Sequence, residues 1–230
     1  MKFGIVTFPG SNREEDAFQA VSMVGGASAV RLWHKDHDLQ GADVVILPGG
    51  FSYGDYLRVG AIARFSPIMR EITEHARLGG PVLGICNGFQ ILCESQLLPG
   101  ALLRNASLRF SSQWVTLRVE QTHTMFTNAY RPGALLRVPV AHGDGRFTAD
   151  PESLLRIEGE GQVVFRYVDR SGVLDLAANP NGSLNNIAGI MNDTGNVLGL
   201  MPHPEDAVDP LLGSTDGLGL FESMLARVAA

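Results

Sequence analysis

The chain has 230 residues, of which 45% are hydrophobic and 18% charged, so it can bury a sizeable core and should be globular rather than disordered. Its 18 Lys and Arg residues and 24 Asp and Glu residues give a formal net charge of −6, and the basic residues are scattered along the sequence. This balance argues against a nucleic-acid partner or an anionic membrane surface. Neither a secretory leader nor an apolar run long enough to span a bilayer is evident, so we expect a cytoplasmic protein.

The first half of the chain alternates between short apolar runs and amphipathic stretches with helical spacing. Strands are predicted at 2–8, 29–33, 43–47 and 81–85, and helices at 13–24 and 61–77. Nearly continuous apolar strands between helices indicate a parallel sheet that is covered on both faces. The turns after such strands meet at one edge, so we expect Pro9-Gly10, Pro48-Gly49-Gly50 and Cys86 to lie close together.

The second half, beyond Gly100, has shorter apolar runs and is richer in β structure. Strands are predicted at 115–119, 135–141, 163–168, 187–191 and 197–201, loops at 142–147 and 179–186, and a terminal helix at about 216–229. No linker-like tract or repeat divides the sequence. We therefore expect one domain over residues 1–230, of the α/β class, with a mostly parallel central sheet flanked by helices.

The segment 82–92, VLGICNGFQIL, joins a buried strand to a helix through a GxCxG turn. This is the cysteine form of a nucleophile elbow, in which Gly84 and Gly88 leave room for a crowded backbone. Cys86 would stand at the N-terminus of the helix, where unpaired N–H groups and the helix dipole favour a thiolate. The alternative is a small buried hydrophobe, which suits Cys93 because no glycines flank it. About two helical turns separate the two cysteines, so both should be free thiols.

A cysteine nucleophile needs a base, and His203 is the strongest of the six histidines. It lies in GLMPHPE, directly after a predicted strand, at the same sheet edge as Cys86. If Pro202 and Pro204 hold the backbone extended, Glu205 faces the same way as His203 and can orient the imidazole. A histidine between two prolines could also be part of a simple turn.

Other histidines are weaker candidates. His34 and His37, in HKDHD, resemble a metal-binding pair, but no further ligand cluster supports them and a solvated loop is favoured, so no metal site is expected. His142 ends a predicted strand, and its role is left open.

Acyl transfer also requires donors for a developing oxyanion. The N–H of Asn87 follows the nucleophile directly, and the Pro48-Gly49-Gly50 turn can supply a second N–H because glycine lets bare backbone approach the reacting group. The alternative for this turn is plain chain reversal, for which such residues are common.

Together, the PGG, GxCxGxQ and HPE motifs resemble those of the class I (triad) glutamine amidotransferases, which release ammonia from glutamine. The resemblance implies a flavodoxin-like sheet, with Cys86 as nucleophile, His203 as base and Glu205 as the acid that orients it. It also implies Gly50 and Asn87 as oxyanion donors. Gln90, one helical turn after Cys86, matches the family residue that helps to bind the substrate glutamine.

Further segments resemble one branch, the glutaminase subunits of phosphoribosylformylglycinamidine synthases, over essentially the whole chain. They are LPGGFSYGDYLRVGAIA (47–63), RNASLRF (104–110), PVAHGDGRF (139–147), NPNGS (179–183) and LLGSTDGLGLFESML (211–225). Two departures put local contacts in doubt. Asp206 stands where the branch commonly has a basic residue, and Ser111-Ser112 stands where a cysteine is often found.

This branch resemblance implies a role in de novo purine biosynthesis with two partner subunits. A larger synthetase subunit would hold ATP and Mg and convert formylglycinamide ribonucleotide to formylglycinamidine ribonucleotide, and a small accessory subunit would help to assemble the complex. The present sequence has no GxxxxGK[ST] phosphate loop, so no cofactor is expected in this chain. Loops 51–60 and 142–147 are the hypothesised interface.

Two other functions are weighed against this one. Cysteine-elbow peptidases and chaperone-like hydrolases share the sheet and the turn but do not require the HPE motif. A non-catalytic glutamine-sensing subunit should show a broken triad, whereas this sequence contains all three residues. Complex stoichiometry, the activity of the isolated chain and the route of ammonia are left open by the sequence.

Overall fold

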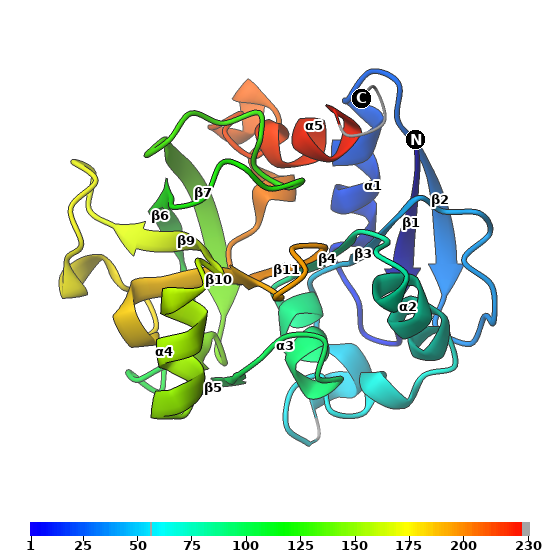
Figure 1. Ribbon diagram of the computed structural model, residues 1–230, viewed down its shortest axis with the longest axis horizontal. Helices are drawn as coiled ribbons and strands as arrows, with labels where there is room; N and C mark the ends of the chain where they lie inside the picture. Colours follow the sequence, from blue (N-terminus) through cyan, green and yellow to red (C-terminus); the bar gives the residue numbers. More distant parts are fainter. Residues whose placement is uncertain (56, 227–230) are drawn as a thin grey trace.

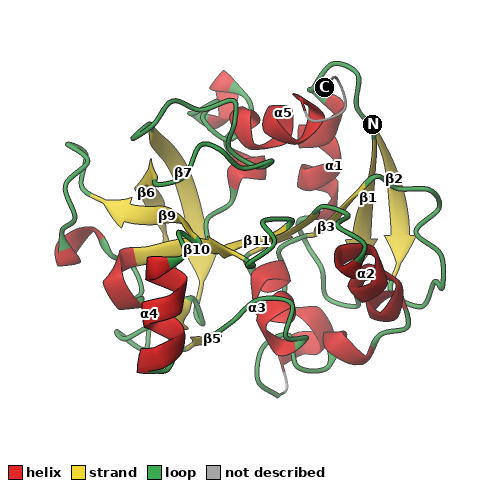
Figure 2. Cartoon of the chain, viewed as in Figure 1, coloured by secondary structure: helices red, strands yellow, loops and turns green. Residues whose placement is uncertain are grey.

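A nine-stranded sheet joins residues from both halves of the chain in the computed structural model, which describes residues 1–55 and 57–226. The strand order is β2-β1-β3-β4-β11-β10-β9-β6-β7. Figure 1 shows the sheet crossing the molecule, and Figure 2 shows helices on both sides of the strand layer. The predicted α/β class, with a central sheet flanked by helices, is confirmed.

Five strands form the parallel part of the sheet. They are β1 (Lys2–Thr7), β2 (Ser28–Trp33), β3 (Val44–Leu47), β4 (Val82–Ile85) and β11 (Val197–Leu200). Every residue of β3, β4 and β11 is buried, which explains why these segments are apolar without alternation. The strand predictions for this part are confirmed, and the carboxyl ends of β1, β3, β4 and β11 meet at one edge.

Four antiparallel strands extend the sheet beyond β11. They are β10 (Ile187–Met191), β9 (Val163–Val168), β6 (Ser111–Val119) and β7 (Leu135–His142). In β6, Val115, Leu117 and Val119 are buried and alternate with residues that reach solvent, as expected for a sheet with one packed face. The sequence predicted these strands but did not give their antiparallel direction.

Two groups of helices cover opposite sides of the sheet. In the view of Figure 1, α1 (Glu14–Ser22) and α5 (Leu218–Ala226) lie above it, and α2 (Ile68–Arg77), α3 (Asn87–Glu94) and α4 (Pro151–Gly159) lie below it. The predicted terminal helix begins at Leu218, and its last residues, 227–229, lie outside the described part. None of the described helices is long and apolar enough to cross a bilayer.

The helix predicted at 61–77 is shorter than expected. A short 3-10 helix at Ala63–Phe65 is followed by extended Ser66, with ψ 140°, and α2 begins only at Ile68. Pro67 explains this boundary, because a proline disfavours the helical conformation of the residue before it.

One helix and one small two-stranded sheet were not predicted. The helix α4 begins after Asp150, whose side chain accepts a 3.0 Å hydrogen bond from the Ser153 N–H, and Pro151 occupies its first turn. A small sheet pairs β5 (Ala101–Leu103) with β8 (Arg146–Thr148). The prediction of a loop over 142–147 is therefore wrong at both ends, since His142 belongs to β7 and 146–147 belong to β8.

Candidate active site

Cys86 occupies a strained turn between β4 and α3. Its φ of 51° and ψ of −103° lie in a region that non-glycine residues rarely adopt. A Cβ atom at Gly88 would overlap the Leu47 carbonyl oxygen, and one at Gly84 would lie 2.7 Å from the Gly88 carbonyl oxygen. The two glycines thus let α3 start directly against the ends of β3 and β4, and the predicted elbow geometry is present.

His203 and Glu205 form a buried pair beside this elbow. The Nδ1 atom of His203 lies 2.7 Å from Oε1 of Glu205, and each residue is only 2% exposed. The sequence suggested an extended backbone between them, and this prediction is wrong, because Pro204–Asp206 forms a 3-10 turn. The two side chains meet because the turn brings the carboxylate back toward the ring.

The triad residues converge because β4 and β11 are neighbours. Ile85 is opposite Leu200 in the parallel register, and the Cys86 N–H donates a 2.8 Å hydrogen bond to the Leu200 carbonyl. Burial by itself would lower the pKa of His203, but the negative charges of Glu205 and Cys86 raise that pKa well above its usual range. The site therefore favours the protonated form of the His203 ring.

Gly50 lies where two of the predicted turns meet. Its φ is 150°, and a Cβ atom there would lie 2.7 Å from Ser11 Cα and 2.8 Å from the Gly10 carbonyl oxygen. Backbone hydrogen bonds from Phe51 to Gly10 (2.8 Å) and from Asn12 to Gly49 (3.3 Å) join the turns. Neither bond uses the N–H of Gly50. The expectation that these turns gather at one edge is confirmed.

Asn87 and Gln90 connect the elbow to the two loops around it. Asn87 is the first residue of α3, so its backbone N–H has no acceptor within the helix. Its side-chain oxygen accepts a 3.2 Å hydrogen bond from the Ser52 N–H, and its amide nitrogen donates to Gln90 Oε1 at 2.9 Å. Gln90 in turn donates to the Asp144 carbonyl at 2.6 Å. The pair thus orders segments on both sides of Cys86.

His142 belongs to a buried polar network that the sequence analysis missed. Its Nδ1 lies 3.2 Å from Asn105 Oδ1, and its Nε2 lies 3.4 Å from Asn181 Nδ2. Asn181 also donates to the Gly145 carbonyl at 2.8 Å. Burial and, less strongly, the charge of His203 lower the pKa of His142 to about 4. His142 is therefore neutral at pH 7 and supports the site, while His203 is the histidine suited to act as base.

The signal for this network was present in the sequence. Asn105, His142 and Asn181 each belong to a segment that resembles the synthase subunits, namely RNASLRF, PVAHGDGRF and NPNGS. Their mutual contact could not be read from segments so far apart in the chain.

The two histidines that resembled a metal pair differ in environment, since His34 is buried and His37 is exposed. His34 is buried, 2.8 Å from the Tyr53 hydroxyl and 3.3 Å from that of Ser66, so its placement in a solvated loop is wrong. Among residues 1–55 and 57–226, no group of three or more His, Cys, Asp or Glu side chains is arranged to hold a metal ion.

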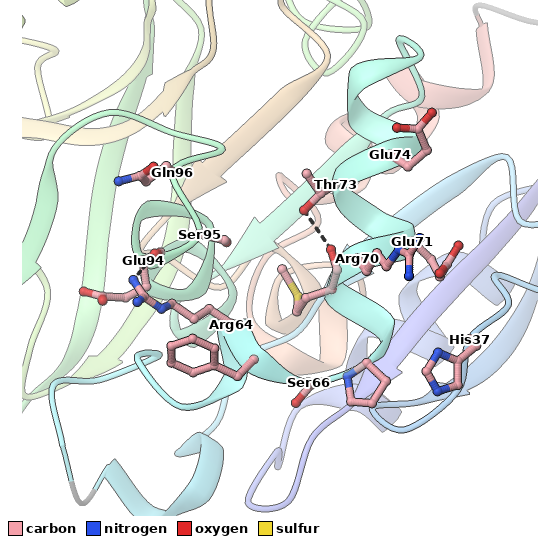
Figure 3. A pocket seen from close by; sticks show the side chains of 13 residues that line it. His37, Arg64, Ser66, Arg70, Glu71, Thr73, Glu74, Glu94, Ser95 and Gln96 are labelled. Carbon is pink, nitrogen blue, oxygen red and sulfur yellow. Dashed lines mark hydrogen bonds between the residues drawn. The ribbon is translucent and has the colours of Figure 1, made fainter.

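A pocket of about 910 Å³ lies away from the elbow, between α2 and the end of α3. Figure 3 shows side chains of mixed charge around it, including His37, Arg64, Arg70, Glu71 and Glu94. None of the predicted site residues lines this pocket. The predicted catalytic residues therefore lie at the edge of the sheet and not in this pocket.

Comparison with known proteins decides the family. Residues 1–216 match the family described as CobB/CobQ-like glutamine amidotransferase domain. The chain belongs to this family. The resemblance that the PGG, GxCxGxQ and HPE motifs indicated is thus confirmed, and the match favours an amidotransferase over the peptidases and chaperone-like hydrolases.

Individual relatives of this amidotransferase are similar over almost their whole length. The phosphoribosylformylglycinamidine synthase subunit PurQ of Chlorobaculum tepidum is 61% identical, over 98% of this chain and 97% of the relative. The subunit of the same name from Thermomicrobium roseum is 56% identical, over 98% and 96%. The structure of PurLQS from Thermotoga maritima has a TM-score of 0.87 and 44% identity, over 99% of this chain and 98% of that one. The narrower resemblance to synthase subunits is therefore confirmed.

Proposed function

We propose that this amidotransferase is the glutaminase subunit of a phosphoribosylformylglycinamidine synthase in de novo purine biosynthesis. It hydrolyses glutamine to glutamate and passes the ammonia to an ATP-dependent synthetase subunit, which converts formylglycinamide ribonucleotide to formylglycinamidine ribonucleotide. The observation that carries the proposal is the 2.7 Å His203–Glu205 contact beside the Cys86 elbow. Sequence identities of 56–61% to PurQ subunits support the choice of pathway.

The first step is attack of the Cys86 thiolate on the side-chain amide carbon of glutamine. A carbon–sulfur bond forms, and the carbonyl electron pair moves to oxygen. The N–H groups of Gly50 and Asn87 are the donors for this oxyanion, since Gly50 stands in the turn beside the elbow and Asn87 starts α3. The strained turn fixes the sulfur without the entropy cost of ordering it during reaction.

His203 moves the protons in the steps that follow. Its imidazolium gives a proton to the amide nitrogen as the carbon–nitrogen bond breaks, which releases ammonia and leaves a γ-glutamyl thioester on Cys86. The neutral imidazole then takes a proton from water, whose oxygen attacks the thioester and releases glutamate. Glu205 holds the Nδ1 side of the ring throughout, so that Nε2 faces the reaction.

Substrate glutamine is recognised beside Gln90. This residue is 5% exposed and donates to the Asp144 carbonyl, so it holds the 143–145 turn against α3. Gln90 thus contributes to binding both directly and through the loop that it orients.

Partner subunits complete the reaction. A large synthetase subunit supplies ATP, Mg and the nucleotide site, and a small accessory subunit assists assembly. Free ammonia is mostly protonated at pH 7, so a protected route between subunits keeps it nucleophilic. Phe51 starts the 51–60 loop and Phe110 lies beside Gly143 of the 142–147 segment. They are 46% and 55% exposed, and such aromatic side chains suit a protein contact.

A chloroketone analogue of glutamine tests the proposal. The chain is incubated with the analogue and digested, and the modified peptide is identified by mass spectrometry, with Cys93→Ala as the matched cysteine control. We expect one adduct on Cys86, protection by glutamine, and glutamate release by the untreated chain assembled with its partners. Labelling that persists in Cys86→Ala would refute the catalytic assignment. Glutamine protection with no glutamate release in the assembled complex would instead identify a sensing subunit.

A further inference from the structure

Arg13 connects the start of α1 to the turn that carries His203. Its Nη1 atom lies 3.0 Å from Oδ1 of Asp206 and 3.2 Å from Oδ2 of Asp16. Asp206 is one of the two departures from the resembled branch that the sequence indicates. The ion pair is partly shielded, since the side chains of Arg13 and Asp206 are 32% and 19% exposed.

Gly49 brings this arginine close to the catalytic imidazole. A Cβ atom at Gly49 would lie 2.8 Å from Cε1 of His203 and 3.1 Å from Cγ of Arg13. The aliphatic part of Arg13 and the edge of the imidazole therefore approach the same point from two sides. The missing side chain at Gly49 thus leaves the space in which the Arg13 stem lies beside the His203 ring.

The charges around His203 show why this arginine is needed. Asp206 directly follows Glu205, so two carboxylates stand next to one imidazole. Burial and the charge of Glu205 raise the pKa of Asp206 to about 6, although His203 and Arg13 oppose that shift. Asp206 is consequently ionised at neutral pH. The other charged or titratable groups around this site are Cys86 at the elbow, neutral His142 on β7 and Asp16 on α1.

We propose that Arg13 is a positioning residue of the glutaminase site, which neutralises Asp206 and supports the His203 ring so that Glu205 and Cys86 set the charge state of the imidazole. The inference rests on the proposed function for its catalytic meaning. Independently of that function, it states that the charges of Arg13 and Asp206 offset each other in their effect on the protonation of Cys86 and His203.

The test is the pH dependence of Cys86 alkylation by iodoacetamide in the full chain, followed by mass spectrometry. Arg13→Met leaves Asp206 uncompensated, and the added negative charge disfavours the thiolate, so the pH midpoint of the rate should rise by about half a unit. Asp206→Asn removes the carboxylate next to the triad and leaves Arg13 paired only with Asp16, so it should lower the midpoint. The double variant should return it to the wild-type value.

Arg77→Met is the matched control, because it removes the same side chain from an exposed ion pair with Glu74 on α2. It should leave the midpoint unchanged. Arg13→Gln provides a second replacement, and thermal unfolding verifies that each variant is folded. Shifts of the same sign in Arg13→Met and Asp206→Asn, or shifts no larger than that of Arg77→Met, would overturn the proposal.

Iodoacetamide does not require the glutamine site, so this test is independent of the assignment of substrate. If the glutamine analogue fails to label Cys86 while Arg13→Met and Asp206→Asn still shift the alkylation midpoint in opposite directions, only the proposed function is rejected. Normal glutamine hydrolysis without those shifts would reject only the role of Arg13.

Discussion

The N–H of Cys86 donates a 2.8 Å hydrogen bond to the carbonyl of Leu200, the last residue of β11. This bond fixes the nucleophile to the strand that ends just before His203. The distance between sulfur and imidazole is thus set by sheet pairing, not by a mobile loop, and the reacting groups are ordered before substrate arrives.

Replacement of Glu205 by Gln should impair catalysis far more than folding. The amide keeps the shape of the side chain but removes the negative charge that opposes the effect of burial on His203. We expect glutaminase kcat to fall by roughly a hundred- to ten-thousand-fold. Steady-state glutamate release measures the loss, and circular dichroism checks the fold. Activity within a factor of about three of wild type would contradict the triad assignment.

Gly49→Ala should damage the site through a single methyl group. The new Cβ would lie 2.8 Å from His203 Cε1, so the imidazole or the Arg13 stem must move. A displacement of this size should reduce kcat at least about tenfold. Gly25→Ala is the control, because nothing lies within 4 Å of its Cβ position. Equal activity of the two variants would show that the tight approach is unimportant.

His142 should make the protein less stable in mild acid. Its folded-state pKa is about 4, below the ordinary value of 6.5, so the unfolded chain binds the proton more tightly. The stability it contributes is therefore present above about pH 6.5 and is lost as pH falls toward 4. Between pH 7 and 5 the loss from this group should be about 2 kcal/mol.

Denaturant titrations of wild type and His142→Gln at pH 7 and pH 5 measure this contribution. The free energy of unfolding should fall less in the variant, which lacks the titrating ring, while other groups affect both proteins alike. An equal fall in both would show that His142 does not titrate in this range.

Phe51 should matter for ammonia transfer between subunits. We expect Phe51→Ser to reduce glutamine-dependent synthesis by the assembled complex while ammonia-dependent synthesis is retained, because only the glutaminase interface is disturbed. Met23→Ser, at a residue 49% exposed at the end of α1, is the control. A parallel fall of both activities would contradict an interface at the 51–60 loop.

Much of the site could be predicted because the residues that shape it form short motifs in the sequence. Gly84 and Gly88 marked the elbow around Cys86, and apolar strands without alternation indicated the parallel sheet that aligns the turns. The proximity of Glu205 to His203 was predicted for the wrong reason, since a 3-10 turn, not an extended segment, brings them together.

Other features depend on long-range contacts that sequence spacing does not encode. The partners Arg13 and Asp206 are separated by 193 positions, and each alone is an ordinary surface charge in the sequence. His34 was misplaced because its charged neighbours indicated a solvated loop, whereas packing against Tyr53 buries it. The roles of Gly50, Asn87 and Gln90 toward substrate stay predictions.

Pairing of β4 with β11 also determines when the enzyme becomes reactive during its synthesis. Cys86 leaves the ribosome long before His203, and β11 must enter the sheet before the imidazole reaches the sulfur. The growing polypeptide therefore carries a thiol without its imidazole partner until the last part of the sheet has assembled.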